Sequence, residues 1–202
     1  MPGFDRIATV YEPLERLSFS DHLQQARRFC LPHVRRCRRG LLLGDGDGRF
    51  SAALLESAPR IQLDSIDLSS RMLQLAQHRA GANRDRITPL NRDALQYAYP
   101  ADTYDFIGLH FCLDCFSQKA IDTLLPQLER SLRSGGRIAY SDFQGHRYWQ
   151  RTVVAALYLC FRAGAGLKTR SLPEVKWSPQ VKPVADARFL RGLVFSRVLE
   201  TP

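Results

Sequence analysis

The sequence has no long hydrophobic run. No stretch of its 202 residues approaches the roughly 18 to 20 unbroken apolar residues of a membrane-spanning helix. Residues 1–10 contain Asp5 and Arg6 where a signal peptide would have an apolar core. Internal repeats and low-complexity tracts are also missing. We therefore expect a single cytoplasmic domain and exclude a membrane-spanning or repeat protein.

Cysteine is too sparse for a disulfide framework. The five residues, an odd number in a chain of this size, favour reduced thiols. Only Cys112 and Cys115 form a C-x-x-C pair, and a structural zinc site needs a second pair of ligands. Cys30 and Cys37 are too far apart to supply it. We expect these cysteines to pack as apolar side chains and we expect no metal site.

Acidic residues are the minority, with 20 Asp and Glu against 29 Lys and Arg, a net charge of +9 and a pI near 9.7. A solvated helix face is the plain interpretation of the arginine cluster at 27–39, and a surface for RNA, anionic lipid or an acidic substrate is the alternative. The cluster consists of Arg27, Arg28, Arg35, Arg36, Arg38 and Arg39.

The most informative stretch, residues 41–50, reads Leu-Leu-Leu-Gly-Asp-Gly-Asp-Gly-Arg-Phe. A short apolar run, alternating glycines and a run compatible with a helix predict a strand, a tight turn and a helix. Glycine tolerates positive φ and lets a ligand approach the backbone closely. The first N–H groups of the following helix are free to meet polar ligand atoms. This pattern predicts a cofactor site at Gly44, Gly46 and Gly48.

Strands and helices are predicted to alternate through residues 41–143. Buried strands are expected at 41–43, 61–67, 87–90, 104–111 and 137–143. Helices are expected at 50–57, after a cap at Ser69 or Ser70, and at 119–132, followed by a Gly135-Gly136 turn. The alternation argues for an α/β, doubly wound parallel sheet with helices on both faces.

Further elements flank this core. The first 39 residues are expected to be helical, with a second helix that starts near Ser20 and Asp21, runs to Cys30 and is interrupted at Pro32. Residues 147–163 are expected to form an apolar helix and 164–183 a surface loop. Residues 184–190 and 192–199 are expected to form an antiparallel strand pair at the sheet edge.

The glycine spacing departs from a dinucleotide fingerprint, because Arg49 stands where the last glycine of G-x-G-x-x-G belongs. The spacing resembles instead the class I S-adenosylmethionine-dependent methyltransferases, particularly the small-molecule branch related to ubiquinone and menaquinone C-methyltransferases. Five motifs in order carry the resemblance: Gly44 to Gly48, Asp67 to Leu73, Asp93-Ala94, Tyr104 to Ile107, and Leu132 to Ile138. The opening Phe4-Asp5-Arg6-Ile7-Ala8 with Tyr11 resembles that branch as well.

The resemblance implies a Rossmann-like, mostly parallel seven-stranded sheet with an antiparallel carboxyl-terminal strand pair and amino-terminal helices. It implies one methyltransferase domain over residues 1–202. Within it, 1–39 form a helical cap, 40–145 the cofactor-binding core, and 146–202 a substrate-side helix and hairpin. The cofactor is S-adenosylmethionine.

The resemblance also implies roles for individual residues. Asp67 accepts hydrogen bonds from the ribose hydroxyls, and Leu68 and Met72 offer apolar surface to the adenine. Asp93 accepts from the adenine amino group while the Ala94 N–H donates to a ring nitrogen. Residues near the methionine part and the methyl group are His110 and Phe111, with Tyr11 closing over them.

The sequence departs from the family pattern at two positions. The family commonly has an acid two residues before the first glycine, and Leu42 stands there. Asp45, rather than Asp47, is the expected substitute that meets the methionine ammonium. Ser134 replaces the proline of the turn before the fifth strand, which we expect to be harmless.

Methyl transfer is an in-line displacement at a sulfonium, so the protein mainly positions the acceptor and excludes water. A catalytic residue is therefore unknown, and the weak candidates for a base are His110, His146 and Asp142. The acceptor pocket is expected at 11–19, 111–116 and 147–163, which favours a small apolar or aromatic molecule. We expect a monomer or homodimer.

Two alternative functions stay open at this point, and a third is disfavoured. An RNA methyltransferase would use the arginine cluster, but no catalytic motif for a nucleobase amine and no RNA-binding module is present. A non-catalytic S-adenosylmethionine-binding protein is compatible with Leu42. A nicotinamide oxidoreductase is disfavoured by Arg49.

Overall fold

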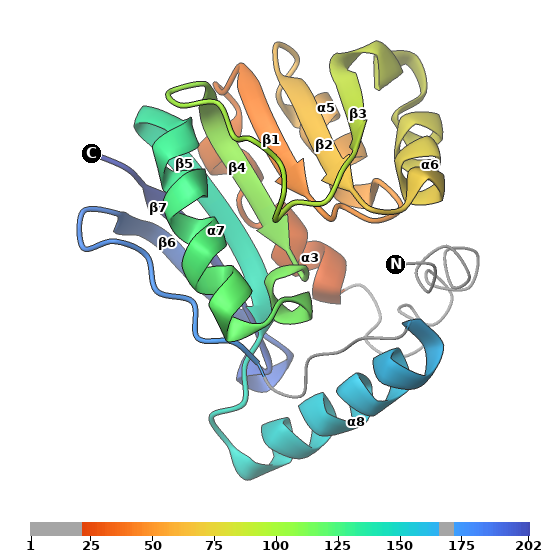
Figure 1. Cartoon of the computed structure of the whole chain (residues 1–202), viewed down its shortest axis with the longest axis vertical. Helices are drawn as coiled ribbons and strands as arrows, with labels where there is room; N and C mark the ends of the chain where they lie inside the picture. Colours follow the sequence, from red (N-terminus) through yellow and green to blue (C-terminus); the bar gives the residue numbers. More distant parts are fainter. Residues whose placement is uncertain (1–21, 166–171) are drawn as a thin grey trace.

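The computed structural model describes residues 22–165 and 172–202, which form one seven-stranded sheet with helices packed against it (Figure 1). The strands lie in the order β3-β2-β1-β4-β5-β7-β6. They are β1 (Arg39–Leu43), β2 (Gln62–Asp67), β3 (Ile87–Asn91), β4 (Tyr104–His110), β5 (Leu132–Phe143), β6 (Lys182–Phe189) and β7 (Val194–Glu200). The predicted helix with Phe4 and Tyr11, and the expected helix start at Ser20, lie outside the described residues.

Strand pairing confirms the predicted α/β doubly wound class. β1 pairs in parallel with β2 and β4, β2 with β3, and β4 with β5, whereas β7 runs antiparallel to both β5 and β6. The strand order reverses between β1 and β4, where a doubly wound sheet places its ligand. The predicted antiparallel hairpin at the sheet edge is therefore found, with its second strand next to β5.

The predicted helices of the core are also found, with shifted ends. Ser69 caps α6 as expected, because its side chain accepts a hydrogen bond from the Met72 N–H. The helices are α3 (His22–Arg28), α4 (Leu31–Val34), α5 (Arg49–Ser57), α6 (Ser70–Ala80), α7 (Gln118–Ser131) and α8 (Tyr148–Ala165), and the short 3₁₀ helices are η1 (Gly81–Arg86), η2 (Leu113–Cys115) and η3 (Leu190–Gly192).

Two expectations about element ends were wrong. The helix expected to reach Cys30 ends at Arg28, although the expected interruption is found, with Pro32 in the first turn of α4, where a missing N–H leaves no bond unmade. β5 begins at Leu132 and not at 137. The register against β4 shifts inside this strand, and Gly135 has a φ of 72°, so the expected glycine turn is a bulge within β5.

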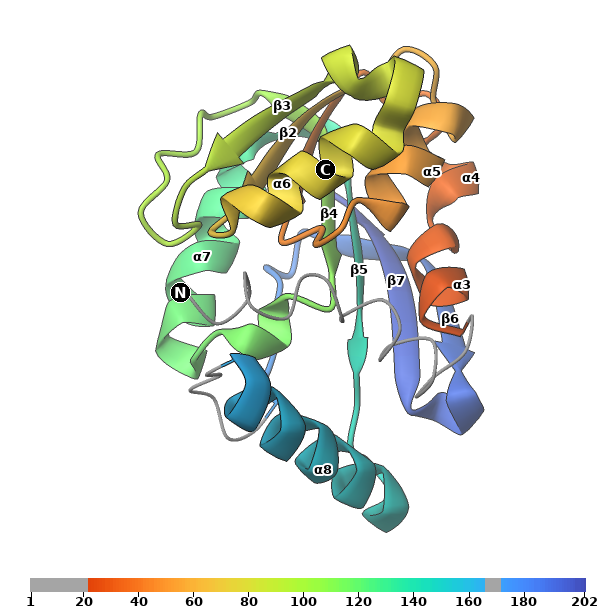
Figure 2. The ribbon, with the colours of Figure 1, turned by 90° about the vertical axis from the view of Figure 1, so that its right-hand side faces the viewer.

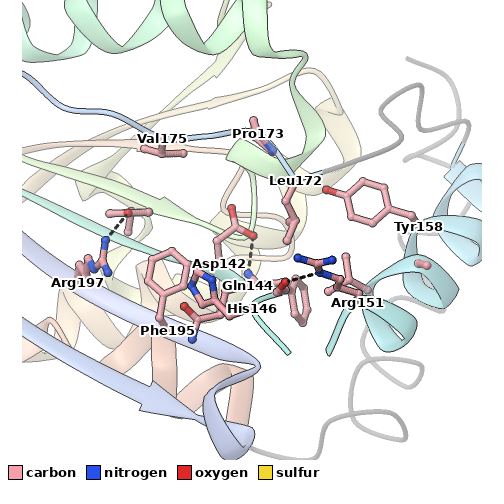
Figure 3. A pocket seen from close by; sticks show the side chains of 15 residues that line it. Asp142, Gln144, His146, Arg151, Tyr158, Leu172, Pro173, Val175, Phe195 and Arg197 are labelled. Carbon is pink, nitrogen blue, oxygen red and sulfur yellow. Dashed lines mark hydrogen bonds between the residues drawn. The ribbon is translucent and has the colours of Figure 1, made fainter. Parts of the chain in front are cut away.

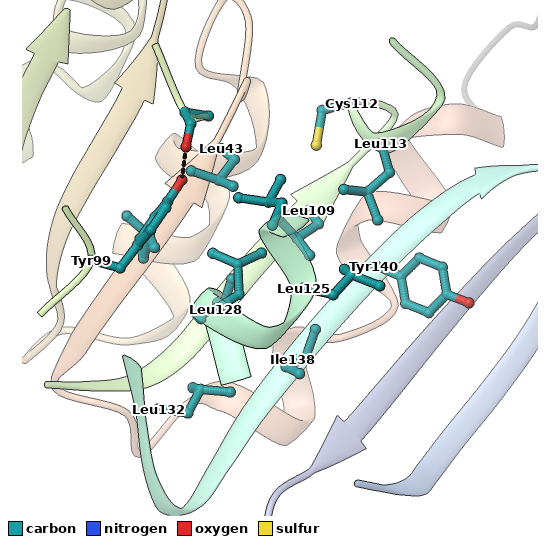
Figure 4. Close-up of a cluster of buried hydrophobic side chains, with 14 of the residues drawn as sticks. Leu43, Tyr99, Leu109, Cys112, Leu113, Leu125, Leu128, Leu132, Ile138 and Tyr140 are labelled. Carbon is teal, nitrogen blue, oxygen red and sulfur yellow. Dashed lines mark hydrogen bonds between the residues drawn. The ribbon is translucent and has the colours of Figure 1, made fainter. Parts of the chain in front are cut away.

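Alternating leucines of β1 build a core on each side of the sheet. Leu41 and Leu43 face the cluster beneath α7, which includes Leu109, Leu125 and Ile138 (Figure 4). Leu42 faces the opposite cluster, with residues of α4 and α5. α7 therefore covers one face, and α3, α5 and α6 cover the other (Figure 2). A strand buried on both faces reads as a continuous apolar run, which is how β1 was predicted.

The helix α8 extends along the lower end of the molecule in Figure 1, away from the layers that cover the sheet. Its inner side packs through Val154 and Tyr158 onto a third cluster with Leu23, Leu193 and Val194. Within the described parts of the chain, no helix has the length and apolar character needed to cross a membrane.

Candidate functional site

The glycines after β1 have different physical reasons to be glycine. Gly44, Gly46 and Gly48 all have positive φ, at 60°, 64° and 82°. A Cβ on Gly48 would lie 2.6 Å from the Cβ of Ala76 in α6, so the third glycine allows two helices to pack. A Cβ on Gly46 would meet no protein atom within 4 Å. Gly46 is therefore the position whose backbone a ligand can approach.

The two aspartates of this loop have different partners and therefore different roles. Asp47 is 6 % exposed and binds the guanidinium groups of Arg49 and Arg79, at 3.2 and 2.9 Å, so it serves the structure of the loop. Asp45 accepts a hydrogen bond from the Ser51 N–H at 3.2 Å, and burial raises its pKa to about 6. Asp45 stays the predicted partner of a ligand ammonium.

Packing explains why the acid of the family pattern is absent at Leu42. This side chain is 1 % exposed, and a Cβ on Gly108 of β4 would lie only 2.6 Å from its Cδ2 atom. The leucine therefore fills the space that the glycine of the neighbouring strand leaves. A carboxylate there would be buried among apolar atoms at a large desolvation cost.

The end of β2 presents an acid and an exposed leucine. Asp67 Oδ1 accepts from the Ser69 N–H at 2.8 Å, and the Asn91 side chain donates to the carbonyl oxygens of Asp67 and Leu68 at 3.0 and 2.9 Å. These bonds fix the turn, and the Leu68 side chain is left 48 % exposed. Met72, in contrast, is 3 % exposed, so its expected contact with an adenine finds no support.

The loop after β3 also presents an acid and an exposed leucine, as the end of β2 does. Asp93 Oδ1 accepts from the Leu95 N–H at 2.9 Å, and the Ala94 carbonyl accepts from the Tyr99 hydroxyl at 2.8 Å. Leu95 is 41 % exposed. Because β2 and β3 are paired, Leu68 and Leu95 follow neighbouring strand ends, and only Leu68 was predicted from the sequence. The only sequence signal for Leu95 is an apolar residue directly after Asp93-Ala94.

His110 is enclosed by other side chains of the protein. Its ring packs edge-on against Phe50 of α5, with centroids 4.2 Å apart, and its Nδ1 lies 3.0 Å from Ser141 Oγ. The side chain is 5 % exposed, and burial lowers its pKa to about 3. An imidazole that holds a proton so weakly is a poor general base, so the structure gives no support to His110 as a catalytic candidate.

A cavity of about 520 Å³ lies beside α8, at the carboxyl end of β5 (Figure 3). Residues of β5, α8, β7 and the segment 172–175 line it, including Asp142, His146, Arg151, Tyr158, Phe195 and Arg197. The helix expected at 147–163 thus lines this cavity, and its role at an acceptor stays a prediction. Residues 111–116 do not line this cavity, and residues 11–19 lie outside the described chain.

A buried acid, Asp142, and a half-buried one, Asp114, lie at this end of the sheet. Burial, and then the charge of Asp114, raise the pKa of Asp142 well above its usual range. Burial raises the pKa of Asp114 to about 6, and its carbonyl oxygen accepts from the Tyr158 hydroxyl at 3.2 Å. Two carboxyl groups that disfavour each other's charge can hold one proton between them.

Neither cysteine of the C-x-x-C pair is activated. Burial raises the pKa of Cys112 and of Cys115 well above the ordinary value, so both are neutral thiols at physiological pH. Among residues 22–165 and 172–202, no group of three or more His, Cys, Asp or Glu side chains is placed to hold a metal ion.

Arg35 and Arg36 of the arginine cluster lie at the opposite end of the strands, whereas Arg27 stacks on the Phe111 ring just after β4. Arg35, Arg36 and Arg137 line a second hollow of about 720 Å³, together with His33 and Asp105. This hollow adjoins the start of β1, whereas the glycine loop follows its end. A five-residue strand, about 3.3 Å per residue, separates the two.

The comparisons with known proteins agree with this geometry. A family model described as a methyltransferase domain matches residues 41–136. A demethylmenaquinone methyltransferase of Deinococcus radiodurans is 32 % identical over 106 residues, 52 % of this chain and 43 % of the relative. The ubiquinone/menaquinone biosynthesis C-methyltransferase UbiE of Syntrophotalea carbinolica is 30 % identical over 166 residues, 79 % of this chain and 66 % of the relative. The chain belongs to the class I S-adenosylmethionine-dependent methyltransferases.

The fold of this methyltransferase is similar to that of a solved methyltransferase structure. The N-methyltransferase NodS from Bradyrhizobium japonicum WM9, solved with S-adenosyl-L-homocysteine, is similar with a TM-score of 0.70 at 17 % identity, covering 100 % of this chain and 97 % of that one. The methyltransferase chain thus spans 43 % and 66 % of the two relatives above but nearly all of a solved neighbour.

Proposed function

We propose that this methyltransferase transfers the methyl group of S-adenosylmethionine to a small apolar or aromatic acceptor. One observation carries the proposal: Gly46, Asp67 and the cavity beside α8 all lie at the carboxyl ends of strands, namely β1, β2 and β5. A cofactor on the first two and an acceptor in the cavity would then share one side of the protein.

The side chains at these strand ends fit the cofactor of the family. The Asp67 carboxylate suits two ribose hydroxyls, and the exposed Leu68 and Leu95 side chains offer apolar surface on either side of an adenine. Asp93 and Ala94 suit the adenine edge, as the sequence predicts. The open backbone at Gly46 leaves room for the methionine part, near Asp45. When bound, the sulfonium cofactor supplies the reactive methyl group.

The cavity supports an apolar or aromatic acceptor. Its volume of about 520 Å³ falls in the range of small-molecule pockets, roughly 300 to 1,000 Å³. Aromatic and aliphatic side chains make up much of its lining, including Phe143, Val154, Tyr158 and Phe195. The polar side chains of the lining are Asp142, Gln144, His146, Arg151 and Arg197. The relative from Syntrophotalea carbinolica is named for ubiquinone and menaquinone biosynthesis, and a quinone-like ring suits such a lining.

Calorimetry with S-adenosylmethionine and with S-adenosylhomocysteine tests the cofactor site. Asp67→Ala should weaken both affinities by about 100-fold or more, since it removes two hydrogen bonds to a charged acceptor worth about 1.5 to 3 kcal/mol each. Asp85→Ala is the matched control, because that side chain is 92 % exposed on η1. Absence of binding, or equal affinities for Asp67→Ala and the wild type, would refute the proposed site.

Transfer of a labelled methyl group to a panel of quinols, phenols and acyl compounds tests the acceptor class. Turnover with any of them dismisses the alternative of a non-catalytic cofactor-binding protein, which Leu42 suggested. An RNA acceptor is less well supported, because the hollow lined by Arg35 and Arg36 is at the opposite end of the strands from Gly46 and Asp67.

A further inference from the structure

The outward side of α8 is unusual for an exposed helix surface. Tyr148, Thr152, Ala156 and Leu159 recur at helical spacing and are all exposed, opposite the buried Val154 and Tyr158. Tyr148 is 88 % exposed and Leu159 is 67 % exposed. None of these four outward positions carries a charge, whereas an ordinary surface helix has charged residues on its solvent face.

The sequence of α8 and of its flanking segments carries charge of one sign. Residues 143–173 contain no Asp or Glu and five Lys or Arg. Arg147 lies just before α8 and Arg151 lies in its first turn, and both are exposed. Trp149, beside them, is 38 % exposed. Exposed aromatic and aliphatic side chains next to arginines are the composition of helices that lie in a lipid interface.

We propose that α8 docks this protein onto an anionic lipid surface through Tyr148, Thr152, Ala156 and Leu159, with Arg147 meeting the lipid headgroups. The other side of the same helix lines the cavity through Arg151, Val154 and Tyr158. A docked α8 therefore places the cavity directly behind the lipid surface. An apolar acceptor dissolved in the lipid would then reach the cavity without crossing water, a consequence that rests on the proposed function.

Flotation of the full chain with lipid vesicles tests the docking in the absence of cofactor. The chain should bind vesicles of phosphatidylcholine and phosphatidylglycerol in equal parts, bind phosphatidylcholine alone more weakly, and be released by high salt. The double variant Tyr148→Gln and Leu159→Gln should lower the partition coefficient at least about tenfold, because two apolar side chains lose their burial in lipid. Glutamine keeps the helix propensity.

Matched variants locate the binding face. Val184→Thr changes an apolar side chain of β6 that is 44 % exposed, and it should leave vesicle binding unchanged. Arg147→Gln should lower binding about fivefold, as expected for one basic residue at an anionic surface. Arg36→Gln, in the hollow at the opposite end of the strands, should have no effect. The reverse pattern, with Arg36→Gln releasing the protein and the α8 variants binding normally, would overturn the proposal.

Other occupants of this face give distinct results. If another segment of this chain covers it, the double variant will lower the thermal unfolding midpoint and leave vesicle binding unchanged. If a second copy covers it, sedimentation will show a dimer that the double variant dissociates, without vesicle binding. Either result overturns the proposal. Calorimetry with S-adenosylhomocysteine, done without vesicles, reports separately on the proposed function.

Discussion

Gly48 and Ala76 bring α5 and α6 together at a point where no additional Cβ fits. The Cβ of Ala76 lies 2.6 Å from the position that a Cβ on Gly48 would occupy. Gly46, two residues earlier, has open space at the same position. The two glycines share a positive φ, but only one of them is required by packing.

The variants Gly48→Ala and Gly46→Ala should therefore behave differently. Gly48→Ala adds a clash to the cost of positive φ and should lower the free energy of unfolding by about 3 kcal/mol or more. Gly46→Ala carries only the backbone cost, about 1 to 2 kcal/mol, but should weaken S-adenosylhomocysteine binding. Urea denaturation and calorimetry measure the two effects. Equal destabilisation by both variants would contradict the packing role of Gly48.

Asp45 gives the cofactor site a pH dependence. Its pKa is raised to about 6 by burial, so the carboxyl group is neutral below that pH and charged above it. If it meets the ligand ammonium, S-adenosylhomocysteine affinity should fall as the pH is lowered through about 6. Ser51 donates to this carboxylate, and the charges of Arg27 and Asp47 also act on it.

Asp45→Asn should remove most of this dependence, as measured by calorimetry between pH 5 and pH 8 in about one-unit steps. The stability effect has the opposite sign. A raised pKa means that the folded state binds the proton more tightly, so the contribution of Asp45 to stability is greatest below its ordinary pKa and is lost as the pH rises toward about 6. If the affinity of Asp45→Asn showed the same pH dependence as that of the wild type, a group other than Asp45 would bind the ligand ammonium.

His110 should matter for acid stability and little for cofactor binding. Its pKa is lowered to about 3 from an ordinary 6.5, so the unfolded chain binds a proton that the folded state does not. Stability should therefore fall as the pH is lowered from about 6.5 toward 3, and His110→Gln should make this fall less steep. Thermal unfolding between these limits measures it. A loss of methyl transfer in His110→Gln at unchanged stability would restore its catalytic role.

Asp142→Asn should separate the acceptor step from cofactor binding. The substitution relieves the repulsion with Asp114 and keeps an oxygen that can accept from the Phe143 N–H, so the unfolding midpoint at neutral pH should rise. Methyl transfer to a protic acceptor should fall if Asp142 receives the acceptor's proton. Calorimetry should show unchanged S-adenosylhomocysteine affinity, and full turnover in this variant would exclude Asp142 as the base.

The core was predictable because its signals are local. The leucines of β1 are apolar on both faces of the sheet, and Ser69 caps α6 through its own side chain, so each pattern stands within a few neighbouring residues. The start of β5 was not predictable, because the bulge at Gly135 depends on the register with β4. Strand ends were set by pairing rather than by composition.

The site was only partly predictable for the same reason. The positions of Asp67 and Asp93 at strand ends follow from the order of elements along the chain. The cavity does not, because Phe195 and Arg197 of β7 meet Tyr158 of α8 only through the pairing of β7 with β5. The surroundings of His110 were not predictable either, because its contacts with Phe50 and Ser141 join residues far apart in the sequence.

The strand order near β7 constrains how the chain assembles during synthesis. β6 is made before β7 but lies outside it, paired to no other strand of the described sheet. Until residues 194–200 have left the ribosome, β5 therefore has an open edge and β6 has no place to bind. A newly made strand edge of this kind invites pairing with other chains, so the interval between the synthesis of β5 and that of β7 is when this methyltransferase is most exposed to aggregation.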